Sequence, residues 1–293
     1  MTPVPFKQVD VFTNTPYRGN PVAVVLDAQG LSSDQMQRIA NWTNLSETTF
    51  VLPPTHADAD YQVRIFTPQS ELPFAGHPTL GTAHALIEAG VVAVKQGKLV
   101  QECGAGLIEL SVTARTGESP LIAFKLPVPT LTPVKEDRLQ ELESILGASI
   151  LREHSPKLVN VGPVWTIVQL QSADAVLGLR PDYARMADFN RQDESIGVVV
   201  FGAYGEDANA AIEVRAFAPS VGVNEDPVCG SGNGSVAAFI RDAGQIGQFG
   251  ATYVATQGSI VGRDGKLVVS FEGADTIRVG GQSVTCIEGV ITQ

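Results

Sequence analysis

Residues 71–90 read ELPFAGHPTLGTAHALIEAG, and residues 225–244 read EDPVCGSGNGSVAAFIRDAG. At one constant offset the two stretches share Glu71/Glu225, Pro73/Pro227, Gly76/Gly230, Ala83/Ala237, Ala89/Ala243 and Gly90/Gly244. Just upstream, Arg64, Phe66 and Pro68 recur as Arg215, Phe217 and Pro219. Each copy predicts a strand, a Gly-containing turn and a short helix ended by a glycine. The repeat therefore predicts two pseudo-symmetric lobes whose equivalent turns face each other across a cleft.

The segments around the repeat predict an α+β fold with mainly antiparallel sheets. Residues 6–13 and 19–26 have strand patterns, and a helix with Ser32 or Ser33 as its cap follows them. Residues 161–170 and 178–189 have the same strand-then-helix order in the second half. Further strands are expected in the segments 98–114, 121–127, 253–262, 266–273 and 282–291.

The division into lobes follows from the proline content between the two halves. The stretch LPVPTLTPVKED (126–137) is rich in proline and is predicted as the linker. We therefore expect an N-terminal lobe at 1–127 and a C-terminal lobe at 128–293, with the final strand (282–293) free to cross back to the first lobe. The active-site cleft is expected between the lobes.

Composition excludes several classes of protein. The chain has 293 residues, 44% of them hydrophobic and 17% charged, with a net charge of −11. This charge argues against a nucleic-acid surface, although backbone N–H groups can still hold a small anion. No apolar run approaches the roughly 20 residues of a membrane span. The first residues lack the apolar core of a signal peptide, so a cytoplasmic location is expected.

The three cysteines are few and widely spaced. Cys103, Cys229 and Cys286 form neither a disulfide framework nor a zinc-site spacing, and no cluster with metal-ligand spacing is present. Cys103 and Cys286 lie in predicted strands and are interpreted as core residues. No metal site is therefore predicted.

The two helix starts are the candidate binding elements. If strands wrap around each repeated helix, its apolar residues are enclosed and its first turn opens at the sheet edge. The expected enclosed residues are Leu80, Ala83, Leu86 and Ile87 in one helix, and Val236, Ala237, Phe239 and Ile240 in the other. Free backbone N–H groups and the positive dipole end would then hold a carboxylate or phosphate. The alternative is that the glycines serve only the tight turns.

The candidate chemical groups lie at the positions where the two copies differ. Ala75 corresponds to Cys229, His77 to Ser231 and Leu72 to Asp226. A racemase with two thiol bases would need cysteine at both 75 and 229, and only Cys229 is present. Cys229 is either a reactive thiol near a helix start or a buried structural one.

His77, Asp226 and Glu47 are the candidate acid–base residues. His77 lies inside a repeated turn, and Asp226 either starts a turn before Pro227 or orients the imidazole or a substrate amine. Glu47, in NLSETTFV, precedes a strand and is otherwise surrounded by uncharged residues. It is either a solvated carboxylate or a partly buried general acid–base, because burial favours the protonated form.

Four stretches together carry a resemblance to a known family: VDVFTNTPYRGNPVAVV, NLSETTFVL, RIFTPQSELPFAGHPTLGTA and NEDPVCGSGNGS. In this order and over essentially the whole chain, they resemble the phenazine-biosynthesis PhzF-like isomerases, which have the diaminopimelate-epimerase-like fold. The resemblance implies two lobes, each a curved antiparallel sheet around a central helix. It also implies an enzyme without a cofactor, which moves a proton within a small substrate and forms a homodimer.

The resemblance also assigns residues. The family's acid–base glutamate falls on Glu47, its cleft histidine on His77, its EDP aspartate on Asp226 and its serine on Ser231. The backbone of Gly76 and Gly230 would cradle a substrate carboxylate. Where the phenazine enzyme's motif resembles DPVTGSAH, this chain has DPVCGSGN, so Cys229, Gly232 and Asn233 alter the pocket beside the chemistry and put the phenazine precursor in doubt as substrate.

The predicted function is a cofactor-independent isomerase that shifts a double bond in a small carboxylate, with Glu47 as acid–base. Catalytic roles are expected for Glu47, His77 and Asp226, and substrate contacts for Gly76, Cys229, Gly230, Ser231 and Gly232. One alternative is an epimerase or racemase that pairs Cys229 with Glu47. Another is a non-catalytic homologue that binds a small anion.

Overall fold

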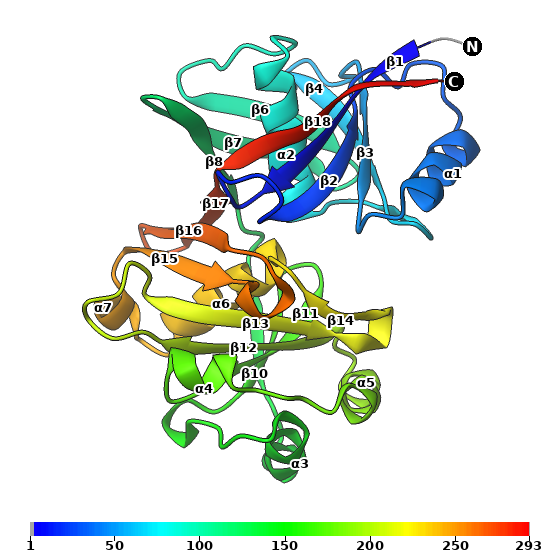
Figure 1. Ribbon diagram of the computed structural model, residues 1–293. Coiled ribbons are helices and arrows are strands. Elements are labelled where there is room, and N and C mark those ends of the chain that lie inside the picture. Colours follow the sequence, from blue (N-terminus) through cyan, green and yellow to red (C-terminus); the bar gives the residue numbers. More distant parts are fainter. Residues whose placement is uncertain (1–2, 293) are drawn as a thin grey trace. The chain divides into compact units, whose positions relative to one another are not determined.

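The computed structural model describes residues 3–292, which form two compact units. Unit 1 contains the residues up to Lys125 together with those from Gly280 onward, and unit 2 runs from Leu126 to Val279. Figure 1 labels their helices and strands.

Unit 1 is a sheet with two helices. Its strands are β1 (Pro3–Val11), β2 (Asn20–Val25), β3 (Thr48–Leu52), β4 (Tyr61–Phe66), β5 (Glu71–Leu72), β6 (Lys98–Cys103), β7 (Gly106–Arg115), β8 (Glu118–Lys125) and β18 (Ser283–Thr292). Its helices are α1 (Ser33–Thr43) and α2 (Gly76–Glu88).

Unit 2 repeats this plan with additional short helices. Its strands are β9 (Thr130–Pro133), β10 (Lys157–Asn160), β11 (Val164–Gln169), β12 (Gly197–Ala203), β13 (Ile212–Ala218), β14 (Val223–Asp226), β15 (Thr252–Gln257), β16 (Gly265–Glu272) and β17 (Thr276–Gly281), which ends beyond the unit boundary. Its α-helices are α3 (Glu136–Leu146), α4 (Ala173–Leu177), α5 (Tyr183–Gln192), α6 (Gly230–Asp242) and α7 (Ile246–Phe249). Short 3-10 turns lie at Arg152–His154, Pro219–Val221 and Ser259–Val261.

Strand pairing confirms the internal duplication. Along the sheet of unit 1, the order β18–β1–β2–β3–β4–β6–β7 alternates antiparallel pairs with parallel pairs at β2/β3 and β4/β6. In unit 2, the order β9–β10–β11–β12–β13–β15–β16 has parallel pairs at the equivalent places, β11/β12 and β13/β15. The predicted α+β fold with mainly antiparallel sheets is therefore confirmed.

Each repeated helix is the centre of its unit. In unit 1, α2 packs against β1, β2, β3, β8 and β18, and in unit 2, α6 packs against β10, β11, β12 and β16 (Figure 1). The apolar side chains predicted to be enclosed are buried, except that Ile87 keeps partial exposure. Close packing of α2 on β2 depends on Gly81, because a Cβ there would lie 2.4 Å from Val22 Cγ1.

The helix ends follow the sequence signals. Ser32 caps α1 through a capping box with Gln35, and Asp182 caps α5. Gly90 and Gly244, just beyond α2 and α6, have φ of +68° and +71°, a backbone conformation that glycine adopts without strain.

Two segment predictions need correction. The segment 98–114, predicted as a strand, is the hairpin of β6 and β7, which turns at Gly106 with φ +96°. The Pro-rich stretch 126–137, predicted as a linker, contains β9 and the first residues of α3. A strand with prolines is tolerated there because β9 pairs with β10 alone and therefore lies at a sheet edge, where proline needs no ladder donor.

Among the helices of residues 3–292, none is long and apolar enough to cross a membrane.

Candidate active site

The start of α2 brings two predicted residues of unit 1 together. His77 Nε2 lies 3.3 Å from Glu47 Oε2, and both side chains are largely buried. Glu47 directly precedes β3, which pairs in parallel with β2, and His77 is the second residue of α2. The N-cap residue of α2, Ala75, makes no side-chain hydrogen bond to the helix start, so it does not compete with an anion for the first backbone N–H groups.

The imidazole of His77 is neutral over the physiological range. Burial lowers its pKa to about 3, while a hydrogen bond to the backbone of Pro21 acts in the opposite direction. Proline has no N–H, so the ring donates to the Pro21 carbonyl. Since Nε2 makes no hydrogen bond within the described part of the chain, that donor is Nδ1. Nε2 therefore carries a lone pair and faces the Glu47 carboxyl.

The start of α6 in unit 2 is closed by Cys229 instead. The Cys229 Sγ accepts a hydrogen bond from the Gly232 N–H at 3.2 Å, and Gly230 is buried beside it. Burial and then the nearby charge of Asp226 raise the pKa of this thiol well above its ordinary value. Cys229 thus acts as a helix cap and stays protonated, and the Gly232 N–H is already engaged.

Gln257 holds this turn in place and was not singled out from the sequence. Its side-chain oxygen accepts from the Cys229 N–H at 3.1 Å and from Asn233 Nδ2 at 2.8 Å, and its Nε2 donates to the Asp226 carbonyl at 2.9 Å. Gln257 ends β15, which pairs with β13 far from the motif in sequence. No local pattern marks such a residue.

Asp226 lies at the end of β14, half-buried against the same turn. Its Oδ1 accepts from the Val228 N–H at 3.0 Å, and the Cys229 thiol donates to its carboxylate. Burial outweighs these hydrogen bonds and raises the pKa of Asp226 to about 6. The side chain can therefore exchange a proton near neutral pH.

Comparison with known proteins decides the family. The family model described as phenazine biosynthesis-like protein (PhzC-PhzF) matches residues 9–289. The chain belongs to this family. It is 43% identical to antisense-enhancing sequence 1 of Schizosaccharomyces pombe, covering 99% of both chains. It is 36% identical to the trans-2,3-dihydro-3-hydroxyanthranilate isomerase of Pseudomonas fluorescens, covering 97% of both.

A solved structure of the PhzF family agrees. The crystal structure of the Bacillus anthracis phenazine biosynthesis protein superposes with a TM-score of 0.87 at 25% identity, covering 100% of both chains. The PhzF-like isomerase family and its fold, predicted from the sequence motifs, are thus confirmed.

The elevated pKa of Asp226 predicts a pH-dependent stability in this PhzF-like chain. The pKa of Asp226 is about 6 in the folded state and 3.8 as the ordinary value. The difference stabilises the fold fully below pH 4, and this stabilisation is lost as the pH rises through 6. Asp226→Asn removes the buried charge and keeps an oxygen for the Val228 N–H. We expect this variant to be about 1–2 kcal/mol more stable than wild type at pH 8, after allowance for solvent screening, and no more stable at pH 4. Urea unfolding at the two pH values measures this, and a variant less stable at both would contradict it.

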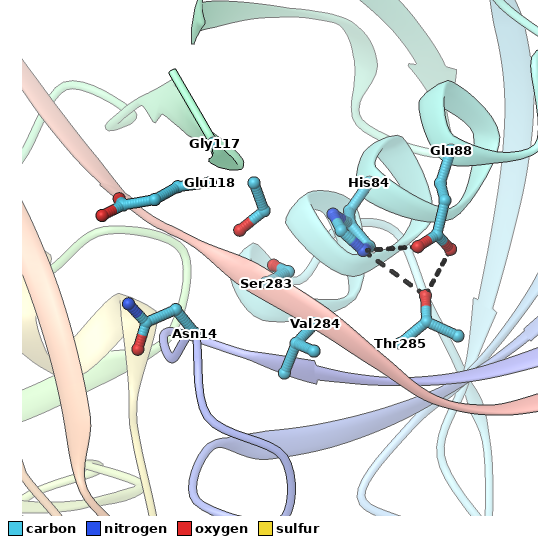
Figure 2. Close-up of a pocket in the computed structure, with 9 residues that line it drawn as sticks. Asn14, His84, Glu88, Gly117, Glu118, Ser283, Val284 and Thr285 are labelled. Atoms are coloured by element: carbon cyan, nitrogen blue, oxygen red, sulfur yellow. Dashed lines mark hydrogen bonds and ion pairs between the residues drawn. The ribbon is translucent and has the colours of Figure 1, made fainter. Parts of the chain in front are cut away.

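A second polar cluster of unit 1 lies towards the other end of α2, around a pocket of about 380 Å³ (Figure 2). Thr285 Oγ1 donates to Glu88 Oε2 at 2.6 Å, so it can only accept from His84 Nε2, 3.4 Å away. Lys7, which is buried, donates from Nζ to the same Glu88 oxygen at 2.5 Å. Glu88 therefore compensates a buried cation.

Glu88→Gln should destabilise the protein by about 1–3 kcal/mol, because it leaves the buried Lys7 ammonium without a close carboxylate. Glu288 is the matched control: its carboxylate lies 3.7 Å from the same Nζ, but its side chain is 73% exposed. Glu288→Gln should change the unfolding free energy by less than about 0.5 kcal/mol. Thermal and urea unfolding of the two variants test the difference, and equal effects would refute it.

No three His, Cys, Asp or Glu side chains within residues 3–292 gather into a group that could hold a metal ion.

Proposed function

We propose that this chain is a cofactor-independent isomerase that shifts a double bond in a small carboxylate by proton transfer. Glu47 is the general acid–base: it removes a proton from one carbon and returns one to another on the same face. The observation that carries the proposal is the Glu47–His77 contact of 3.3 Å at the uncapped start of α2. Once Glu47 has taken a proton from carbon, its acid group can donate to the Nε2 lone pair of the neutral imidazole, so His77 would hold the carboxyl in one orientation until the proton is returned.

Residues of unit 2 supply binding in this proposal. Asp226 contacts the polar substituent of the substrate, and Ser231 with the backbone of the α6 start contacts its carboxylate. The family name and the named reaction of the Pseudomonas fluorescens relative support a ring-bearing amino acid of the dihydro-hydroxyanthranilate class as the substrate type.

The state of Cys229 argues against the epimerase alternative. A carbon base must be deprotonated, whereas burial and the charge of Asp226 keep this thiol protonated. Its Sγ also serves as the cap of α6. Loss of the thiol proton would also break its hydrogen bond to Asp226 and place two negative charges side by side.

The test is incubation of the protein in D₂O with small unsaturated amino and hydroxy acids, including trans-2,3-dihydro-3-hydroxyanthranilate, followed by NMR of carbon-bound hydrogen. Deuterium entry together with a shifted double bond is expected. Deuterium at a stereocentre without a bond shift, lost in Cys229→Ser, would replace the proposal by the epimerase. If no compound of the panel exchanges hydrogen for deuterium, the proposal is contradicted for this substrate class.

A further inference from the structure

The side chains at the two helix starts are held by different partners. In unit 1, His77 faces Glu47. In unit 2, the equivalent residue of α6 is Ser231, and its Oγ accepts a hydrogen bond from the indole Nε1 of Trp165 at 3.0 Å. Trp165 is buried, and its indole N–H can only donate.

Strand pairing shows that Trp165 in unit 2 occupies the position that Ala23 has in unit 1. The first residue of β3, Thr48, pairs with Ala23, and the first residue of β12, Gly197, pairs with Trp165. A Cβ on Gly197 would lie 2.1 Å from the Phe217 carbonyl oxygen and 2.6 Å from Cζ3 of the indole. Unit 2 therefore combines a large ring with a glycine that makes room for it, where unit 1 has alanine and threonine.

Among the described residues at the start of α6, the Ser231 hydroxyl is the donor that lacks a strong acceptor. The Trp165 N–H goes to Ser231, the Gly232 N–H goes to Cys229 Sγ, and the Cys229 thiol proton goes to Asp226. Within residues 3–292, the acceptor beside the Ser231 hydroxyl proton is the Cys229 sulfur, 3.6 Å away. Sulfur is a weak acceptor, so an anionic oxygen would readily replace it.

We propose that Trp165 is a positioning residue that orients Ser231 so that its hydroxyl donates to a carboxylate oxygen of the substrate. By occupying one of the two acceptor sites of Ser231 Oγ, the indole N–H limits the directions in which the hydroxyl proton can point. The identity of the ligand as a carboxylate rests on the proposed function. The consequence is that the carboxylate is held by a hydroxyl and backbone N–H groups that do not titrate, whereas proton transfer is left to Glu47.

The first test needs no ligand. The chain has two tryptophans, Trp42 and Trp165, so a ¹⁵N-labelled sample gives two indole N–H signals, which Trp42→Phe assigns. Ser231→Ala should move the Trp165 signal upfield and accelerate its hydrogen exchange. The signal of Trp42, whose side chain is exposed, should not change. An unchanged Trp165 signal would overturn the inference.

The second test is a double-mutant cycle with 3-hydroxyanthranilate as the probe and 2-aminophenol, which lacks the carboxylate, as its control. Trp165→Phe keeps the ring packing and removes the N–H. We expect Kd for the probe to rise about 5-fold in this variant and about 10-fold or more in Ser231→Ala. The double variant should bind no more weakly than Ser231→Ala alone, because Trp165 acts through Ser231.

Three results would overturn the proposal: additive losses in the double variant, an equal loss for 2-aminophenol, or no binding of the probe to wild type. Failure of the isomerase reaction is distinguishable from these. If deuterium exchange is absent but the Trp165–Ser231 coupling in binding persists, the positioning role stands without the reaction. If Glu47-dependent exchange occurs without that coupling, the positioning role alone is removed.

Discussion

Glu47→Gln is expected to lower turnover by about 10³-fold, within the range measured for the loss of a general acid–base. An amide cannot release and recapture a proton at neutral pH. It can, however, donate a hydrogen bond to the Nε2 lone pair of His77, which lies 3.3 Å from the Glu47 carboxyl. The contact that orients residue 47 should therefore survive, and the unfolding free energy should stay within about 1 kcal/mol of wild type.

The measurement is the rate of deuterium incorporation in D₂O for wild type, Glu47→Gln and Glu47→Asp. The aspartate variant is the matched control, because it keeps a carboxyl but withdraws it by one methylene. It should retain more activity than the glutamine variant. Near-wild-type exchange in Glu47→Gln would remove Glu47 from the chemistry.

The second large effect concerns a repeated ion pair in two different surroundings. Arg215 in β13 binds Glu225 in β14 through two hydrogen bonds of 2.9 and 2.8 Å, with side chains only 2% and 6% exposed. Its third nitrogen donates to the carbonyls of Val176 and Leu179. Arg215→Ala leaves a buried carboxylate without its cation and two carbonyls without a donor. We expect a loss of about 3–5 kcal/mol of stability.

The duplicated pair in unit 1 is the control. Arg64 and Glu71 make the same two hydrogen bonds, at 2.7 and 2.6 Å, but their side chains are 27% and 42% exposed. Arg64→Ala should therefore cost about 1 kcal/mol or less. Urea unfolding followed by circular dichroism, and by fluorescence of Trp165 in a Trp42→Phe background for unit 2, measures both.

A further variant separates charge burial from packing. In Arg215→Met/Glu225→Leu both charges are absent, so much of the stability lost in Arg215→Ala should return. If the double variant is as unstable as the single one, the pair stabilises unit 2 through its geometry and not through mutual charge compensation.

The repeat made the centre of each unit predictable. Gly90 and Gly244 marked the helix ends, and the apolar residues between each turn and its glycine marked the buried helix face, because both signals are local. The family motifs indicated Glu47 and His77, which the structure places together. The roles of the predicted site residues in catalysis stay predictions until the variants are measured.

The residues that sequence reasoning missed act through tertiary contacts. Gln257 and Trp165 lie in segments recognised only as strands, and they reach the α6 turn from elsewhere in the sheet. Pro21 contributes a backbone carbonyl, which carries no side-chain signal. The hairpin of β6 and β7 was missed because its turn, Gly104 to Gly106, sits inside one long run of strand-forming residues.

The return of β18 to unit 1 has a consequence for the order in which the protein folds. Unit 2 is one continuous stretch of chain, whereas unit 1 needs residues from both ends, since β1 lies between β2 and β18. During synthesis, β1 must wait with one edge unpaired until β18 has emerged from the ribosome. The usual N-terminal-first sequence of domain folding is then reversed: the later-encoded unit can finish first, and the long-range β1–β18 pairing closes the fold last.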